Sequence, residues 1–288
     1  MNYTQEQLDR LRAVEIELYF EFARICEKFQ LQYVTGCGTA LGAIRHKGYI
    51  PWDDDMDFLM PRADYERFIE IAPKELGDKY GLLEPRTEKN YVMAFAKIIR
   101  KDSTFIEATD THLKYHSGIF IDIFPMDYWP QEKKKRDYVA FRCFVLARLC
   151  CLATYKKPKL PVGMKPWKGK IAHIGCCMIH YGLKLFGQST QKLYNRYLKS
   201  VMATSPEEAG HYVTDMCACR IRKDGMFGLQ YKDTDLFTPM DVPFEDIQLP
   251  IPKKYDSYLT ILYKDYMKLP PEDERHCHPP AVLEFPKD

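Results

Sequence analysis

Four aspartates within five positions, Asp53, Asp54, Asp55 and Asp57, are the residues of this chain best suited to chemistry. They lie between apolar stretches, so the backbone heads into a core while the carboxylates stay clustered. Crowded carboxylates repel one another away from bulk water, and a bound divalent cation is the natural compensation. The alternation that follows predicts a strand with Asp55 and Asp57 on one face. A solvated acidic turn is the alternative, which the apolar flanks disfavour.

A further aspartate, Asp122, interrupts the apolar segment 118–124, which is typical of a strand. An unpaired buried carboxylate is costly, so Asp122 either meets a buried partner or joins the acidic strand. In the second case it supplies the third carboxylate that a two-metal phosphoryl-transfer site needs. We therefore predict Asp55, Asp57 and Asp122 as catalytic residues and metal ligands, with Mg²⁺ or Mn²⁺ as the cofactor.

Several other residues are candidates for binding an anionic substrate. A glycine-containing turn opens a short predicted helix, where free N–H groups and the helix dipole favour phosphate. Basic side chains end that helix or lie on a later strand, where they could neutralise a diphosphate, although each is as often a surface charge. The candidates are Gly38, Thr39, Arg45, His46, Lys97 and Arg100.

The pattern of the chain predicts an α/β (α+β) protein. Thr4 and Gln7 form a capping box that starts an amphipathic helix ending near Gln30. Later segments alternate between short strands and helices, and 131–200 is largely helical, broken by a segment at 156–170 that is rich in Pro, Gly and Lys. We expect three parts: a catalytic core at 1–130, a helical insertion with a basic loop at 131–205, and a part at 206–288 that completes the core.

Composition narrows the class of protein. The 288 residues carry 42 Lys and Arg against 40 Asp and Glu, so no global field argues for nucleic acid. The first residues have no secretory pattern, and the apolar segment 138–155 is interrupted by arginines, so we expect a cytoplasmic protein with a packed helix there instead of a membrane span.

Ten cysteines in apolar surroundings suggest reduced thiols. A structural zinc is the alternative for one irregular set: Cys217, Cys219, His276, Cys277 and His278.

The stretch 36–57 closely resembles the signature of the LicD family, which also includes fukutin and fukutin-related protein. Further likeness lies at 96–100, 104–107, 121–127, 244–252 and 263–266, so the resemblance spans most of the chain and leaves about 131–200 uncovered. It implies a nucleotidyltransferase-like core with a mixed sheet, in which Asp55 and Asp57 match the metal-binding pair and Asp122 the third acid. Gly38-Thr39 matches the family's turn, and Thr104 joins the substrate-binding candidates. Where the family often has Tyr-Gly-Asp, this chain has Tyr263-Lys264-Asp265, without the residue best suited to a tight turn.

The resemblance also implies a reaction. Bacterial members resemble phosphocholine transferases that use CDP-choline to decorate teichoic acid, lipopolysaccharide or other surface glycans, and the fukutin-related branch uses CDP-ribitol. A hydroxyl of the acceptor would attack the distal phosphoryl group, and CMP would leave. The alternatives are a CDP-ribitol or CDP-glycerol donor, an enzyme that transfers the nucleotide itself, and a catalytically silent binding module.

The segment 156–170 also suggests a location. Six lysines surround Trp167 there, and an anionic bilayer attracts basic and aromatic residues. A solvated linker between helices is the interpretation that this composition slightly favours. Because surface glycans are often assembled on lipid carriers at the cytoplasmic face, the alternative is peripheral contact with the inner face of the membrane and a lipid-linked acceptor.

Overall fold

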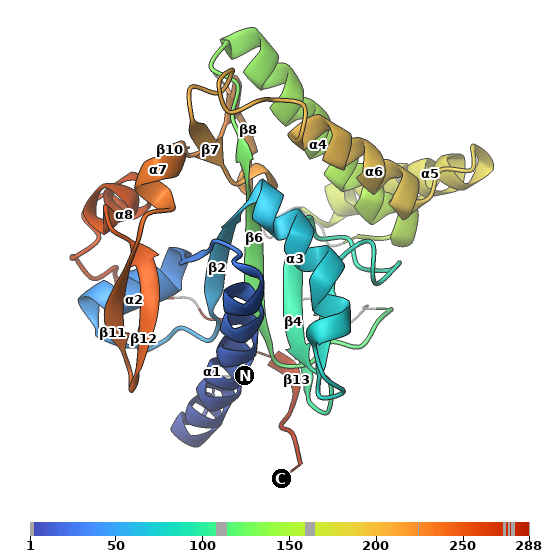
Figure 1. Cartoon of the computed structure of the whole chain (residues 1–288). Helices are drawn as coiled ribbons and strands as arrows, with labels where there is room; N and C mark the ends of the chain where they lie inside the picture. The colour runs from blue at the N-terminus through green and yellow to red at the C-terminus, as the bar shows by residue number, and fades with distance from the viewer. Residues whose placement is uncertain are drawn as a thin grey trace.

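A seven-stranded mixed sheet forms the centre of the molecule (Figure 1). The structure, a computed structural model, describes residues 3–107, 114–158, 165–223, 225–272, 275, 277 and 280–287. The strands of the sheet follow the order β1-β2-β6-β4-β3, and β7 pairs with the end of β6 and with β10. Their bounds are β1 Val34–Thr35, β2 Asp57–Pro61, β3 Tyr80–Leu83, β4 Ala96–Arg100, β6 Phe120–Tyr128, β7 Tyr212–Thr214 and β10 Tyr231–Lys232.

Strands β2 and β6 run parallel, whereas the other neighbouring pairs in this sheet are antiparallel. A parallel pair needs a crossover connection, which here includes α3 (Arg62–Glu75) and the strands β3, β4 and β5 (Thr104–Glu107). The mixed sheet with interleaved helices confirms the predicted α/β class.

Helix α1 (Gln5–Phe29) crosses one face of the sheet. Its first turn is closed by the predicted capping box, in which the Gln7 N–H donates to Thr4 Oγ1 at 3.2 Å. The buried side of the helix carries Leu11, Leu18 and Phe22, whose side chains pack against the sheet. Burying large apolar side chains stabilises the fold by about 1.5–3 kcal/mol each, so α1 is an integral part of the core.

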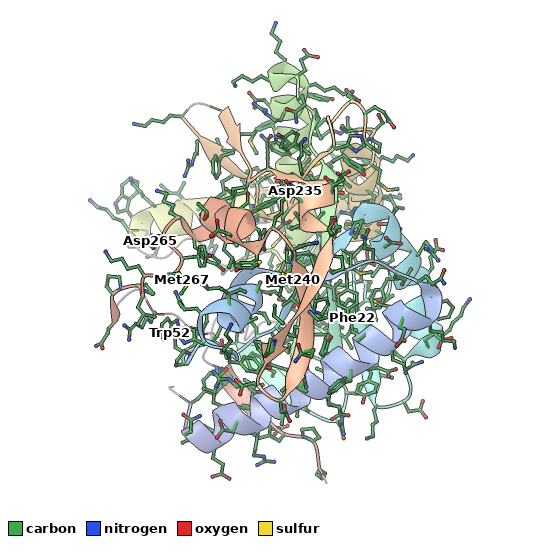
Figure 2. All side chains as sticks on the ribbon, turned by 60° about the vertical axis from the view of Figure 1, so that its left-hand side comes forward. Phe22, Trp52, Asp235, Met240, Asp265 and Met267 are labelled. Atoms are coloured by element: carbon green, nitrogen blue, oxygen red, sulfur yellow. The ribbon has the colours of Figure 1, made fainter. Side chains whose placement is uncertain are left out.

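Helix α2 (Cys37–Arg45) lies at the β1 end of the sheet, beside a hairpin from the far end of the chain. Figure 2 looks towards this hairpin and α1, with Met240 labelled on β11 and Phe22 on the helix. Strand β11 contacts α2, and β12 contacts β1. The C-terminal elements here are α7 Asp233–Leu236, β11 Pro239–Phe244, β12 Ile247–Pro252 and α8 Tyr255–Tyr263.

A last strand, which the sequence did not predict, brings the C-terminal region back to the middle of the chain. Strand β13 (Pro280–Glu284) pairs antiparallel with β5, and a second small sheet joins β8 (Arg220–Arg222) to β9 (Gly225–Phe227). Strands are also present at Tyr212, Phe227 and Ile247, in agreement with the predicted alternation of short strands and helices.

The helices of the expected insertion form a second apolar cluster. Helices α4 (Lys133–Thr154) and α6 (Thr190–Val201) pack together, and the same cluster includes Trp129 and Met216 of the 3-10 turn η1 (Met216–Ala218). The predicted break from 156 to 170 was too long, because α5 (Pro166–Leu185) begins within it. A proline suits the first turn of a helix, where its missing N–H would have no intrahelical partner. The division of the chain at residues 130 and 205 stays a prediction.

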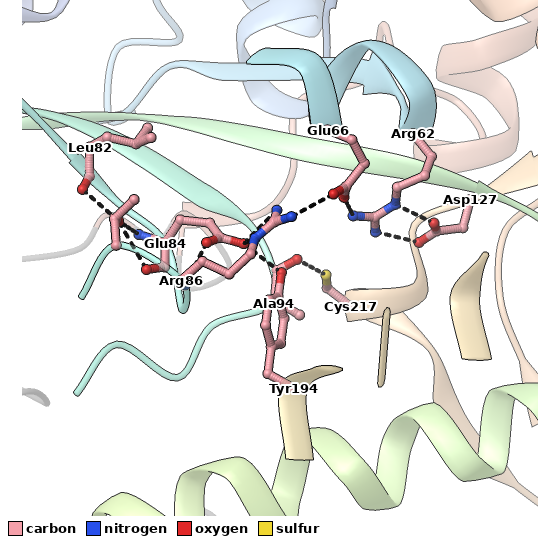
Figure 3. A network of polar contacts seen from close by, with 10 residues as sticks. Arg62, Glu66, Leu82, Glu84, Arg86, Ala94, Asp127, Tyr194 and Cys217 are labelled. Carbon is pink, nitrogen blue, oxygen red and sulfur yellow. Dashed lines mark hydrogen bonds and ion pairs between the residues drawn. The ribbon is translucent and has the colours of Figure 1, made fainter. Parts of the chain in front are cut away.

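A polar network joins the two clusters (Figure 3). Buried Arg62 on α3 donates two hydrogen bonds to Asp127 on β6, at 2.6 and 2.9 Å. The network continues from Arg62 through Glu66, Arg86, Glu84 and the hydroxyl of Tyr194 on α6. These buried ion pairs keep their side chains in one arrangement, because breaking any of them would leave an uncompensated buried charge.

Among the residues described, none of the helices has the length and apolar character required to cross a membrane.

Candidate active site

The parallel pairing of β2 and β6 brings three aspartates together. Asp57 on β2 lies opposite Asp122 on β6, and Asp55 lies two residues before the start of β2. One carboxylate oxygen from each lies within 4.8 Å of the other two. In the described part of the chain, these three aspartates form a group of Asp, Glu, His or Cys side chains that are close enough together to hold a metal ion. Three hard oxygen donors at this spacing suit Mg²⁺ or Mn²⁺.

The start of α2 fixes the backbone of this cluster. The Asp57 N–H donates to buried Thr39 Oγ1 at 2.9 Å, and the Gly36 N–H donates to the Asp57 carbonyl at 2.9 Å. A Cβ at Gly38 would come within 2.6 Å of an Asp53 carboxylate oxygen, so a side chain at this position would displace that carboxylate. Gly38 and Thr39 thus lie against the acidic loop, and the Thr39 hydroxyl is used to hold Asp57.

Helix α1 and Tyr3, which precedes the helix, also hold the acidic loop. The Arg12 guanidinium donates to the carbonyls of Ile50 at 2.9 Å and Asp53 at 2.8 Å, and the Tyr3 hydroxyl donates to Asp54 at 2.6 Å. Glu15, also on α1, is buried, and its pKa is raised well above the usual range by burial and then by Asp55. Sequence reasoning missed these residues. Glu15 could have been found from the sequence, because it is an acidic residue on the apolar stripe of the helix, between Leu11 and Leu18.

Burial and like charge dominate the electrostatics of the cluster. The pKa of Asp57 is raised well above its usual range, first by burial and then by the neighbouring charges of Asp55 and Asp122. Lys97 on β4 offsets part of this repulsion, since its Nζ lies 2.8 Å from Asp122 Oδ1. The register of β4 and β6 places Lys97 directly opposite Asp122. A bound divalent cation would relieve the remaining repulsion.

A pocket lined by aromatic and acidic side chains opens beside the cluster. Asp55 and Asp122 are among its lining residues, and so is Lys97, whose Nζ lies 3.2 Å from the centre of the Phe120 ring. The other lining residues are Met93, Phe95, Phe105, Glu107, Tyr115 and Ser117. Sequence reasoning did not find this pocket, although the alternation in β5 places Phe105 and Glu107 on one face.

The remaining substrate-binding candidates lie elsewhere. Arg100 is three residues beyond Lys97 on the same strand, so it faces the opposite side, where it pairs with Glu17 of α1 and with Asp102. Thr104 donates to Glu284 Oε2 at 2.8 Å, also away from the cluster.

Arg45 and His46 end α2 and are directed towards the C-terminal segment. Arg45 donates to the Tyr266 carbonyl and to His46 Nε2, both at 2.9 Å, and the His46 ring lies 6.5 Å from that of Trp52. Their contacts therefore brace the end of α2 and the loop after it.

The zinc alternative finds no ligand set in the described part of the chain. The thiols of Cys217 and Cys219 donate to the backbone carbonyls of Ala94 and Asp215. Cys277 lies apart from them, near Asp54, and His276 and His278 lie outside the described residues.

Fold and site together define a nucleotidyltransferase-type domain. Residues 30–144 match the family model described as LicD/FKTN/FKRP, nucleotidyltransferase domain. This match confirms the resemblance of residues 30–144 to the LicD family. The matched segment carries β1, β2, β6 and the three aspartates, and it ends within α4.

Two relatives extend this finding. The chain is 28% identical over 265 residues to the lipopolysaccharide cholinephosphotransferase LicD of Haemophilus influenzae, which covers 89% of this chain and 90% of that protein. It is also 44% identical over 52 residues to an uncharacterized protein of Rickettsia typhi, but that match covers 17% of each chain. The first relation includes the helical segment that the family model leaves unmatched.

Proposed function

We propose that the protein transfers phosphocholine from CDP-choline to a hydroxyl group of a cell-surface glycan, such as lipopolysaccharide or teichoic acid, and releases CMP. The near full-length relation to a lipopolysaccharide cholinephosphotransferase supports this reaction class. The single structural observation that carries the proposal is the position of the aromatic, acidic pocket directly beside the three aspartates.

The lining of the pocket favours choline over a polyol. A quaternary ammonium binds over aromatic faces and has no hydrogen-bond donors, whereas ribitol or glycerol requires several polar partners. The rings of Phe95, Phe105 and Phe120 and the carboxylate of Glu107 offer the first kind of environment. The Lys97 ammonium, 3.2 Å from the centre of Phe120, shows that this ring accepts a cation.

The chain's own residues supply the rest of the mechanism. Asp55, Asp57 and Asp122 would hold Mg²⁺ or Mn²⁺, which when bound offsets negative charge on the donor phosphates. Lys97 would contact the same phosphates, and a carboxylate of the cluster would take the proton of the acceptor hydroxyl. The aromatic lining keeps water from the phosphoryl group that is transferred.

Mass spectrometry of a glycan acceptor incubated with CDP-choline, CDP-ribitol or CDP-glycerol tests the proposal. We expect phosphocholine on the acceptor and CMP in solution, with loss of both in EDTA and recovery after Mg²⁺ is restored. A polyol phosphate on the acceptor would instead identify the CDP-ribitol or CDP-glycerol alternative. Covalent nucleotide in the product would identify a nucleotide-transferring enzyme.

The choice of donor is tested by Phe95→Leu, which keeps an apolar side chain and removes one ring of the pocket. We expect a higher KM for CDP-choline, by about tenfold if one aromatic face is lost. Phe20→Leu, on the exposed side of α1, is the matched control. An unchanged KM in the Phe95 variant would argue against choline in this pocket.

We further propose that the enzyme works in the cytoplasm, at the inner face of the membrane, on a lipid-linked acceptor. The apolar and basic character of the helical segment between residues 138 and 206 supports this location.

A further inference from the structure

The outward side of α5 carries a continuous row of large exposed side chains. They recur every three or four residues, so at 3.6 residues per turn they fall within an arc of about 80°. Each is between 58 and 81% exposed. The row, called the α5 stripe below, consists of Trp167, Ile171, Ile174, Met178, Tyr181 and Leu185. An exposed apolar surface of this extent marks an interaction site.

The opposite side of α5 is fixed to the end of α4. Buried His180 has Nδ1 2.6 Å from the Leu152 carbonyl, and the Cys177 thiol donates to the Lys156 carbonyl at 3.4 Å. Leu183 packs against the second apolar cluster. These contacts set the rotation of the helix, so the stripe faces outward because the other side is already packed.

The charge around the stripe has a single sign. Twelve of the 42 Lys and Arg residues lie between positions 138 and 206, and all 40 Asp and Glu residues lie outside that segment. Lys168 and Lys170 are exposed and flank the stripe on its two sides, as expected from 100° of rotation per residue. A helix with an apolar stripe between lysines is typical of an element that lies in a membrane interface.

We propose that the α5 stripe inserts into the headgroup region of an anionic lipid bilayer, with the flanking lysines against lipid phosphates. Pairing of two stripes in a dimer would bring two segments of the same positive charge together, which disfavours a second copy as the occupant. The proposed function explains why the protein would bind a membrane, but the binding itself does not depend on that function, since binding to lipid requires no phosphoryl transfer. It relocates the expected membrane contact from the basic loop to the face of the helix.

The position of α5 connects this surface to the pocket. The Lys114 ammonium donates to the Thr154 carbonyl at 2.9 Å, and the Tyr155 hydroxyl donates to the Asn90 carbonyl at 3.3 Å. The end of α4 that holds α5 therefore touches the two segments that supply Met93 and Tyr115 to the pocket. A docked helix would bring a lipid-linked acceptor close to the carboxylate cluster.

Co-sedimentation with vesicles tests the proposal with the full chain. We expect binding to phosphatidylcholine vesicles that contain phosphatidylglycerol, weakened by salt, and no binding to pure phosphatidylcholine. Ile174→Ser with Met178→Ser should lower partitioning at least about tenfold, because both side chains lose their apolar contact with lipid. Lys168→Gln with Lys170→Gln should also lower it about tenfold. Trp167 emission should shift to the blue on binding.

Matched controls separate the stripe from general effects. Phe20→Ser removes an equally exposed apolar side chain from α1, and Lys74→Gln with Lys89→Gln removes two exposed lysines elsewhere; both should bind as the original protein does. Equal partitioning of the stripe variants and the controls would overturn the proposal. Self-association that is lost in the stripe variants, without vesicle binding by the original protein, would overturn it in favour of a dimer. The stripe variants should still release CMP normally in solution. If they do, a negative result for membrane binding would leave the proposed function unaffected.

Discussion

Lys97 and Asp122 lie opposite each other on adjacent strands and form an ion pair at 2.8 Å. The pair is mostly buried, and it places one positive charge against a cluster of three carboxylates. Lys97 therefore offsets part of the negative charge of the cluster, and a metal ion bound by Asp122 would compete with Lys97 for the same carboxylate.

Replacing Lys97 by Met should expose this competition. Removing one member of a buried ion pair leaves the other uncompensated, so we expect the metal-free protein to lose about 3 kcal/mol of unfolding free energy. Saturating Mg²⁺ should restore much of that loss, which gives the variant a larger metal-dependent increase in melting temperature. Lys101→Met, at an exposed position beyond the same strand, is the control. Identical metal-induced shifts in all three proteins would contradict the competition.

Asp57→Asn should separate activity from stability. Burial and the adjacent charges raise the pKa of Asp57, so a neutral amide relieves repulsion while deleting a predicted metal ligand. We expect phosphotransfer to fall more than about 100-fold while the metal-free protein stays as stable or becomes more stable. Asp54→Asn removes a neighbouring charge outside the cluster and keeps an acceptor for the Tyr3 hydroxyl. A folded Asp57 variant with near-normal turnover would refute the assigned role.

The acidic site was predictable because its residues are close in sequence or interrupt strongly apolar strands. Alternation placed Asp55 and Asp57 on one face, and Asp122 stood out in an apolar run. The register that sets Asp57 opposite Asp122 depends on a parallel pairing across more than sixty residues, which local patterns do not encode. The same alternation, applied to β4, would have predicted that the side chains of Lys97 and Arg100 lie on opposite faces of the sheet.

The pocket and the α5 stripe escaped prediction for different reasons. The pocket draws its lining from segments that are far apart in the chain, so the alternation within each segment, as in Phe105 and Glu107, does not show that they meet. In α5 the helical period was present, but Pro166 and Gly169 were read as breaks although both lie in the first turn. In the prediction, the low helix preference of proline and glycine thus counted for more than the helical spacing of the apolar residues, and that spacing is what matches the structure.

Asp215 should make stability depend on pH between about 4 and 6. Burial raises its pKa to about 6, although hydrogen bonds from the backbone N–H groups of Cys217 and Ala218 act in the opposite direction. Because the folded state holds this proton more tightly than the unfolded state, stability is highest below the unfolded pKa and is lost as pH rises through 6. Asp215→Asn should remove that loss, since an amide can still accept from Cys217.

Urea unfolding of the Asp215 variant and the original protein measures this effect. The two should be similar at pH 4, and the variant should be more stable at pH 7.5 by up to about 3 kcal/mol. Asp246→Asn, at an exposed position, should show no such divergence. A constant difference across this pH range would show that Asp215 does not titrate as described.

Lys264 occupies a backbone conformation that normally requires glycine. The turn after α8 is formed even though the family's glycine is absent: Lys264 has φ +61° and ψ −109°, and its N–H donates to the Thr260 carbonyl at 2.9 Å. The turn positions Tyr263, whose side chain is 39% exposed and whose hydroxyl pKa is raised by desolvation, then by Cys37 and by the charges of Asp57 and Asp53. Strain in this region for a residue with a Cβ is about 1–3 kcal/mol.

Lys264→Gly should therefore stabilise the protein, by about 1 kcal/mol after the greater flexibility of glycine in the unfolded chain is subtracted. Lys264→Ala is the matched control, because it removes the same charged side chain and keeps the Cβ that causes the strain. We expect the urea midpoint to rise for the glycine variant, with an unchanged slope, and to stay near the original for the alanine variant. Turnover should be preserved in the glycine variant, since the turn that holds Tyr263 near the acidic cluster is kept. Equal midpoints for the two variants would show that Lys264 adopts its positive φ without strain.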